Sequence, residues 1–211
     1  MKIQLIYDRP SQVSTDLLVV ILDDQYTFHD VAGSPLEEMI RRVQRDIKDK
    51  RLKTEFFSPL DLKGGPRNLL VHSTALNKTH NLWETSKIFV SRSIRFAQDR
   101  GLDRIAVVLN THDAVPFVGK AVEGAILGSY TFDRYRREKT DRSKLQLQIV
   151  GLKSQDERNK RALHRYTVVS NAVNEARDMI NEPGAVVVPE TMAEATSHAE
   201  KPTLSTAPAS W

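Results

Sequence analysis

The side chains that could do chemistry in this sequence match no catalytic motif in their spacing. The six histidines form neither H-E-x-x-H nor a pair four residues apart, so no helical face is predicted to present two imidazoles to a metal ion. No serine lies in a G-x-S-x-G turn, and the nine glycines form neither G-x-G-x-x-G nor a P-loop. The chain has no cysteine, which excludes thiol catalysis, thiolate metal sites and disulfides.

Three residues are nevertheless candidates for a ligand pocket, because ligands of open α/β sheets gather at the carboxyl ends of parallel strands. His112 and Asp113 follow the aliphatic run 105–109, and His72 follows a second predicted strand at 68–71. An isolated His-Asp pair is also an ordinary loop sequence. The sequence leaves both interpretations open.

A basic segment between residues 134 and 144 holds the charge of the whole chain. The chain has 31 basic and 27 acidic residues, a net charge of +4, and the segment has six basic and two acidic ones. Its basic residues are Arg134, Arg136, Arg137, Lys139, Arg142 and Lys144. Such a segment is either a solvated loop or a weak contact for the phosphates of nucleic acid. Only Phe132 and Tyr135 could stack on bases there, which argues against single-stranded partners.

Two continuous aliphatic runs, 17–22 and 105–109, predict strands buried on both faces of a parallel sheet. Weaker strand patterns lie at 2–7, 54–57, 68–71 and 145–150, and helical patterns at 36–47, 82–100 and 118–135. This alternation predicts an α/β domain with a mostly parallel central sheet of about six strands flanked by helices. In the last of those helices, Gly124 and Gly128 are spaced to let the helix lie close on the sheet.

The clearest periodicity predicts one long helix from 157 to 181. Its apolar residues advance in steps of three and four from Ala162 to Ile180, so we expect a single apolar stripe. A short helix at 190–200 and a disordered tail at 201–211 follow. The expected organisation is an α/β N-terminal domain at 1–155, a long linker helix and linker at 156–200, and the tail.

Three stretches in the second half of the chain stand out: AVEGAILGSYTFDRYR at 121–136, SNAVNEARDMINEPG at 170–184 and VPETMAEAT at 188–196. Their order resembles the leucyl aminopeptidase (cytosol aminopeptidase) family, where an N-terminal domain leads into a catalytic domain. The residues that match the family's linker motif are Asn171, Asn174, Ala176, Arg177, Asn181, Glu182, Pro183 and Pro189. The resemblance implies a macro-domain-like N-terminal fold for the preceding strands and helices.

The resemblance also implies a role without catalysis for these residues. In the family, two divalent metals, zinc or manganese, activate water for attack on an N-terminal peptide bond. Their ligands lie in a catalytic domain with an Asn-Thr-Asp-Ala-Glu-Gly-Arg signature, which does not occur in this sequence. We therefore expect no metal, no cofactor and no hydrolytic activity from this chain alone, and a role in assembly, regulation or recognition.

Two alternative functions remain at this point. One is a macro-like module that binds nucleotide or ADP-ribose, although Val71-His72-Ser73-Thr74 stands where relatives have a glycine-rich turn. The other is weak nucleic-acid binding through residues 134–144. We expect a homo-oligomer or a partner chain, because the catalytic domain that would cover the apolar stripe is absent. The sequence has no signal-peptide pattern and no apolar run near the roughly 20 residues of a membrane span, which predicts a cytoplasmic protein without a membrane partner.

Overall fold

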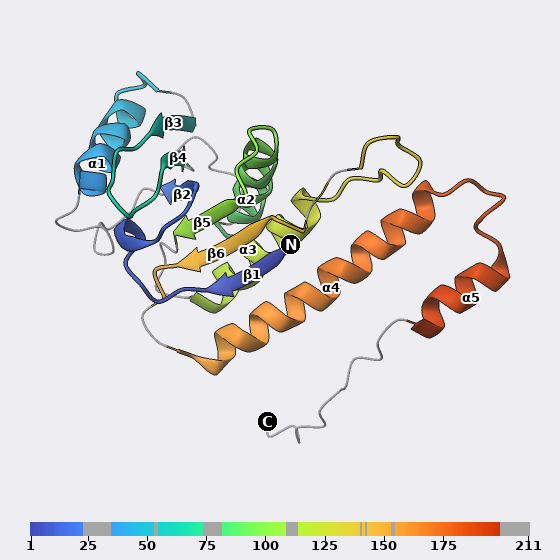
Figure 1. Cartoon of the computed structure of the whole chain (residues 1–211). Helices are drawn as coiled ribbons and strands as arrows, with labels where there is room; N and C mark the ends of the chain where they lie inside the picture. Colours follow the sequence, from blue (N-terminus) through green and yellow to red (C-terminus); the bar gives the residue numbers. More distant parts are fainter. Residues whose placement is uncertain are drawn as a thin grey trace.

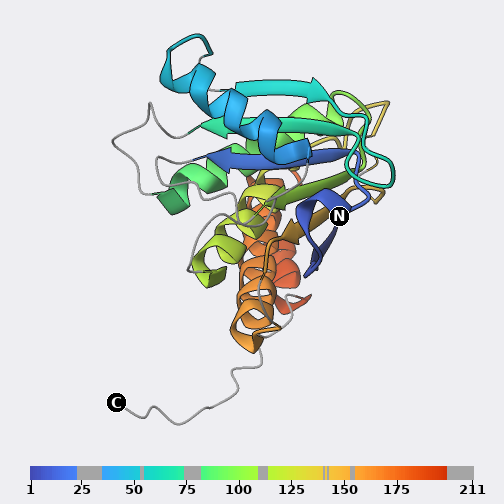
Figure 2. The same ribbon diagram turned by 90° about the vertical axis from the view of Figure 1, so that its left-hand side faces the viewer.

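In the computed structural model, residues 1–22, 35–52, 55–73, 82–108, 114–139, 141, 143–152 and 155–198 are described. They form a six-stranded sheet with helices on both faces (Figures 1 and 2). The strands are β1 (Lys2–Leu5), β2 (Leu17–Leu22), β3 (Glu55–Pro59), β4 (Asn68–Ser73), β5 (Arg104–Val108) and β6 (Gln146–Val150). The helices are α1 (Pro35–Lys48), α2 (Leu82–Gln98), α3 (Ala114–Gly128), α4 (Glu157–Asn181) and α5 (Pro189–His198), with a 3-10 turn at Pro10–Gln12.

The order of strands in the sheet is β1-β6-β5-β2-β4-β3. Every neighbouring pair is parallel except β3 with β4, which pair antiparallel at one edge. Pro59 ends this edge strand and has no backbone N–H to offer a further strand. The predicted α/β class with a mostly parallel sheet of about six strands is confirmed.

The two faces of the sheet bury two separate apolar cores. Strand β2 is buried along its whole length, and its side chains alternate between the faces. Leu17, Val19 and Ile21 join the core under α2 and α3, whereas Leu18, Val20 and Leu22 join the core under α1. A continuous aliphatic run therefore serves both layers, which is why it carries no polar alternation.

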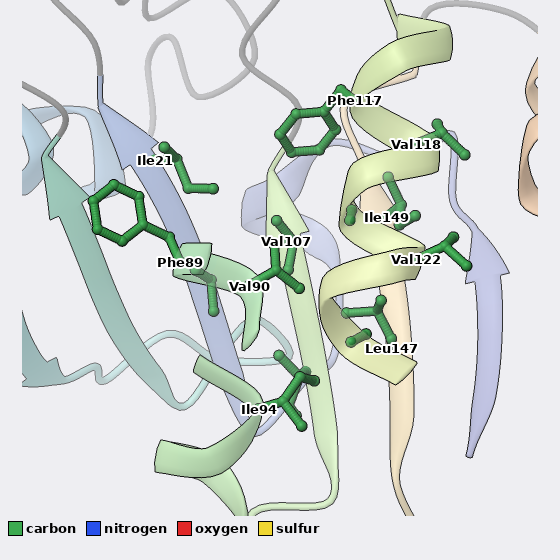
Figure 3. Packing of buried hydrophobic residues seen from close by; sticks show 14 of the residues in the cluster. Ile21, Phe89, Val90, Ile94, Val107, Phe117, Val118, Val122, Leu147 and Ile149 are labelled. Atoms are coloured by element: carbon green, nitrogen blue, oxygen red, sulfur yellow. The ribbon is translucent and has the colours of Figure 1, made fainter. Parts of the chain in front are cut away.

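Helices α2 and α3 form the larger core together. Figure 3 shows side chains of α2 and α3 lying over those of the strands beneath them. The labelled residues of the helices are Phe89, Val90, Ile94, Phe117, Val118 and Val122, and those of the strands are Ile21, Val107, Leu147 and Ile149. Helix α4 lies outside this layer and packs on α3, on the opposite side of the molecule from α1 (Figure 2).

The glycines of α3 allow close contact with its neighbouring helices rather than with the sheet. A Cβ at Gly124 would lie 2.4 Å from the carbonyl oxygen of Lys87 in α2, and one at Gly128 would lie 2.6 Å from Oγ of Ser91. On another side, a Cβ at Gly119 would overlap the ring of Tyr166 in α4 at 2.4 Å. The expectation that this G-x-x-x-G spacing serves contact with the sheet is therefore wrong, because the facing surface is α2.

Helix α3 also occupies a different range from the predicted 118–135. It begins earlier, at Ala114, and ends at Gly128. The hydroxyl of the next residue, Ser129, donates to the carbonyl oxygen of Ile126, and both glycine and serine favour a helix end over a helix interior. Tyr130 fits the helical spacing but belongs to the segment after the helix.

None of the helices in the described ranges is long and apolar enough to cross a membrane.

Candidate interaction surface on the long helix

Helix α4 docks on α3 mainly through small and polar side chains. Its buried residues are Asn159, Ala162 and Ser170, and Tyr166 lies in the space left by Gly119. Such a contact brings two backbones close together, and the larger side chains that α4 adds to it, Leu163 and Tyr166, are only partly buried. The orientation of α4 must therefore be fixed by hydrogen bonds as well as by packing.

Two residues of the linker motif bind the C-terminal end of α3. The last four carbonyl groups of a helix lack partners within the helix. Nδ2 of Asn174 donates to the carbonyl oxygen of Ile126 at 3.2 Å, and the Arg177 guanidinium donates to that of Leu127 at 3.4 Å. The guanidinium also lies near the negative end of the α3 dipole, which favours a cation there.

A second set of contacts involves Tyr130, just beyond α3. Its hydroxyl donates to Oδ1 of Asp178 at 2.8 Å and accepts from Nδ2 of Asn181 at 3.1 Å. The Arg177 guanidinium lies over the ring, 5.4 Å from its centre. Desolvation and the Asp178 carboxylate raise the pKa of Tyr130, so the hydroxyl keeps the proton that it donates.

Glu182 joins the linker motif to the basic segment. Its carboxylate pairs with the Arg134 guanidinium and accepts a hydrogen bond from the Tyr135 hydroxyl, and its side chain is 5% exposed. The hydrogen bond to Glu182 raises the pKa of Tyr135. Arg134, predicted as an anion contact, is thus the partner of a carboxylate within the chain.

The other basic residues of the segment do not share this role. Arg136, Arg137, Lys139 and Lys144 are exposed, and Arg142 lies outside the described residues. In the described part of the segment, one cation is therefore held in an internal ion pair and four are surface charges, and contact of these surface charges with nucleic acid stays a prediction.

The remaining motif residues shape the surroundings of α4. Asn171 lines a cavity of about 530 Å³ together with Met1 and Ile3 near the start of β1. Pro183 lies in the turn after α4, where its carbonyl accepts from the backbone N–H of Val186 at 2.8 Å. Pro189 is the first residue of α5, a position where its missing N–H costs nothing.

The predicted apolar stripe of α4 is divided between two sides of the helix. Leu163, Tyr166 and Met179 are partly buried. Ala162 is buried, whereas the remaining members of the stripe are exposed. Together with the exposed Val168, which was not part of the predicted stripe, they form a strip that we call the valine face, made of Val168, Val169, Ala172, Val173, Ala176 and Ile180. Val169 is 53% and Ile180 82% exposed. Large apolar side chains gathered on one helix surface are typical of an interaction site.

His72 lies in the core instead of lining an open pocket. Its side chain is 1% exposed and stacks on Phe89 with ring centres 4.7 Å apart. The Ser93 hydroxyl donates to the carbonyl oxygen of Phe89 at 2.8 Å, so at 2.8 Å it accepts from Nε2–H of His72. Nδ1 is then unprotonated, and although it lies 3.3 Å from Oε1 of Glu55 it makes no hydrogen bond.

Burial decides the charge of this histidine. Desolvation, with a smaller contribution from the Arg92 guanidinium, lowers the pKa of His72 to about 4. The nearby Glu55 carboxylate is 45% exposed and therefore screened. His72 is neutral at neutral pH and serves packing. His112 and Asp113, the other two predicted pocket residues, lie outside the described residues.

An ion network between α2 and α3 escaped the sequence-based prediction. Lys120 lies 2.5 Å from Glu84 and 3.0 Å from Glu123, and Lys87 lies 2.6 Å from Glu84 and 3.4 Å from Glu123. The hydrogen bonds from Lys120 and Lys87 lower the pKa of Glu84 to about 2. The spacing of three residues within each helix was visible in the sequence, but the pairing between the helices was not.

Among the described residues, no group of three or more histidines and acidic residues could hold a metal ion.

Comparison with known proteins relates the chain to one family over part of its length. No family model matches it. It is 32% identical to a probable cytosol aminopeptidase of Aquifex aeolicus over 127 residues, which cover 59% of this chain and 25% of that protein. A probable cytosol aminopeptidase of Streptomyces avermitilis is 35% identical over 106 residues, 48% of this chain and 20% of that protein. The matches thus span a quarter or less of the length of these relatives.

Solved structures show the same fold. A mutant of tomato leucine aminopeptidase superposes with a TM-score of 0.70 at 20% identity, over 93% of this chain and 41% of that one. The bottromycin maturation enzyme BotP superposes with a TM-score of 0.58 at 16% identity, over 85% of this chain and 36% of that one. At these identities the likeness establishes the fold alone.

Replacing Glu182 by alanine should destabilise the chain, because the Arg134 and Tyr135 side chains lose their common acceptor. We expect the free energy of unfolding, measured by urea denaturation, to fall by about 1–2 kcal/mol. The control is the double variant Arg136→Ala/Arg137→Ala, which changes exposed side chains and should stay within about 0.5 kcal/mol of wild type. An equal loss of unfolding free energy in both variants would show that the contacts of Glu182 stabilise the chain no more than exposed charged side chains do.

His72 should make the fold sensitive to acid. Its pKa is about 4 in the folded chain against 6.5 in the unfolded chain, so the unfolded state binds more protons between these values. The stability that the neutral ring contributes is complete above pH 6.5 and is lost as the pH falls toward 4, by about 3 kcal/mol. In the His72→Gln variant, the free energy of unfolding measured by urea denaturation should not show this loss between pH 6.5 and pH 4. The exposed His164, changed to Gln, should leave it in place; an unchanged profile in His72→Gln would refute the assignment.

Proposed function

Because the chain is related to the N-terminal part of leucyl aminopeptidases, we propose that it is a non-catalytic assembly domain that acts in the cytoplasm. We place the α/β domain at residues 1–155 and the linker at 156–200. In the complete enzymes, the neighbouring domain would remove N-terminal amino acids with two divalent metals, and we assign no step of that chemistry to the described residues. The observation that carries the proposal is the valine face of α4.

The occupant of the valine face is a second copy of the same chain. Homo-oligomers most often form around a two-fold axis, where one patch meets itself. Two α4 helices that cross antiparallel between Val169 and Val173 bring these valines together at the centre. The same arrangement places Arg165 of one copy beside Glu175 of the other, and both side chains are exposed in the single chain. Apolar residues at the centre and opposite charges at the rim are the usual composition of an interface.

Sedimentation equilibrium tests this arrangement. Wild-type chain should form dimers at tens of micromolar, and Val173→Asp should be monomeric, because a buried unpaired carboxylate opposes association. The matched control is Ile88→Asp on α2, since Ile88 is 41% exposed and Val173 39% exposed. This variant should dimerise like wild type.

A charge exchange tests the orientation of the two helices. Arg165→Glu should weaken the dimer several-fold by placing like charges at the rim, and Arg165→Glu/Glu175→Arg should restore it. A strictly monomeric wild type at several hundred micromolar would contradict the proposal and leave the valine face to a different partner. Equal dimerisation of Val173→Asp and wild type would show that another surface is used.

A further inference from the structure

A groove about 630 Å³ in volume lies between α2 and the C-terminal ends of α3 and α4. Gly124 and Leu127 of α3 line it, as do three arginines: Arg92 and Arg95 from α2 and Arg177 from α4. None of the described residues that line it is acidic. Its size is that of a small-molecule site. It lies on the outer side of the helix layer, away from the strand ends where the sequence predicted a pocket.

Two of the arginines are held in place by neutral groups. Nε of Arg95 donates to the carbonyl oxygen of Gly128 at 3.2 Å, and the Arg177 guanidinium donates to that of Leu127 at 3.4 Å. These carbonyls are consecutive, so guanidinium groups from two different helices meet at the end of α3. A carbonyl does not neutralise a guanidinium, and each retains further N–H donors. Each guanidinium therefore has N–H donors left for a ligand.

The other cations of the groove differ in how far they are neutralised. The Arg92 side chain is 60% exposed, and its nearest carboxylate in an ion pair, that of Glu55, is 3.7 Å away, which is too far for a hydrogen bond. Lys87, in contrast, is held by Glu84 and Glu123, which raise its pKa. The groove thus presents three guanidinium groups, two of them bound to backbone carbonyls and one, that of Arg92, in a long ion pair with Glu55 and over the ring of Phe89.

We propose that this groove binds a small anion that carries two or more linked phosphate groups. Guanidinium groups recognise phosphate oxygens through paired N–H donors, and fixing them in advance reduces the entropy lost on binding. Ser91 and Asn181 also line the groove and add polar side chains between the arginines. A single carboxylate would leave most of these donors unused, whereas a diphosphate or triphosphate group offers enough oxygens for all three arginines. This binding site is independent of the dimer proposed above.

Isothermal titration calorimetry with inorganic pyrophosphate and tripolyphosphate tests the site, in buffer with about 0.15 M salt so that exposed charges are screened. Wild-type chain should bind both with one site per chain. Arg92→Gln/Arg95→Gln should weaken binding at least tenfold. The control, Arg136→Gln/Arg137→Gln, removes the same charge from the exposed basic segment and should change affinity less than twofold.

A second variant separates binding from folding, because Arg95 also caps α3. Arg92→Gln alone changes an exposed side chain and should weaken binding about three- to fivefold with an unchanged melting temperature. Equal weakening by the two double variants, or no binding by wild type at millimolar ligand, would overturn the proposal. So would duplex DNA that binds more tightly than tripolyphosphate and depends on Arg136 and Arg137, since the phosphates would then be held by the basic segment.

Discussion

Helix α3 can keep its place only if it carries no side chain at the three positions where it comes closest to its neighbouring helices. Gly124 and Gly128 bring it against the backbone of α2, and Gly119 makes room for Tyr166 of α4. This spacing puts the last turn of α3 within reach of side chains from both neighbouring helices. Its carbonyl groups then accept hydrogen bonds from Arg95 on one side and from Asn174 and Arg177 on the other. The linker motif and the arginine groove both follow from this one close contact.

The same constraint explains the unusual surface of α4. Its inner side meets a glycine and carbonyl groups, and beside Leu163 and Tyr166 that side carries small and polar residues such as Ser170 and Asn174. Exposed or partly exposed polar contacts of this kind fix an orientation but contribute only modest free energy. The valines of α4 and Ile180 lie on the flank of the helix, where they form the valine face. A helix held in position by polar contacts, with its apolar residues uncovered, is suited to assembly.

How much the sequence predicts depends on the sequence separation of the interacting residues. The buried strands and the long helix were predicted because their signals are runs and periods within one element, as in 17–22 and 157–181. The surface that Gly124 and Gly128 contact was not predicted correctly. The spacing of two glycines indicates that the helix lies close to a neighbour, but it does not show whether that neighbour is a helix or the sheet. Arg134 and Glu182 are 48 positions apart, so a charge run gave no sign that one of its members has an internal partner. The burial of His72 likewise depends on Phe89 and Ser93 of a helix that only the fold brings near.

The central claim is that the linker helix α4 is docked firmly on the α/β domain through α3, without help from any further chain. Native-state hydrogen exchange at submicromolar protein, where a dimer is dissociated, tests it most directly. Backbone amides between Ala162 and Asp178 should exchange at least about a hundredfold more slowly than those of an isolated helix, with opening free energies close to those of α3. Exchange of these amides at the rate of an isolated helix, while β2 and β5 remain protected, would contradict the account.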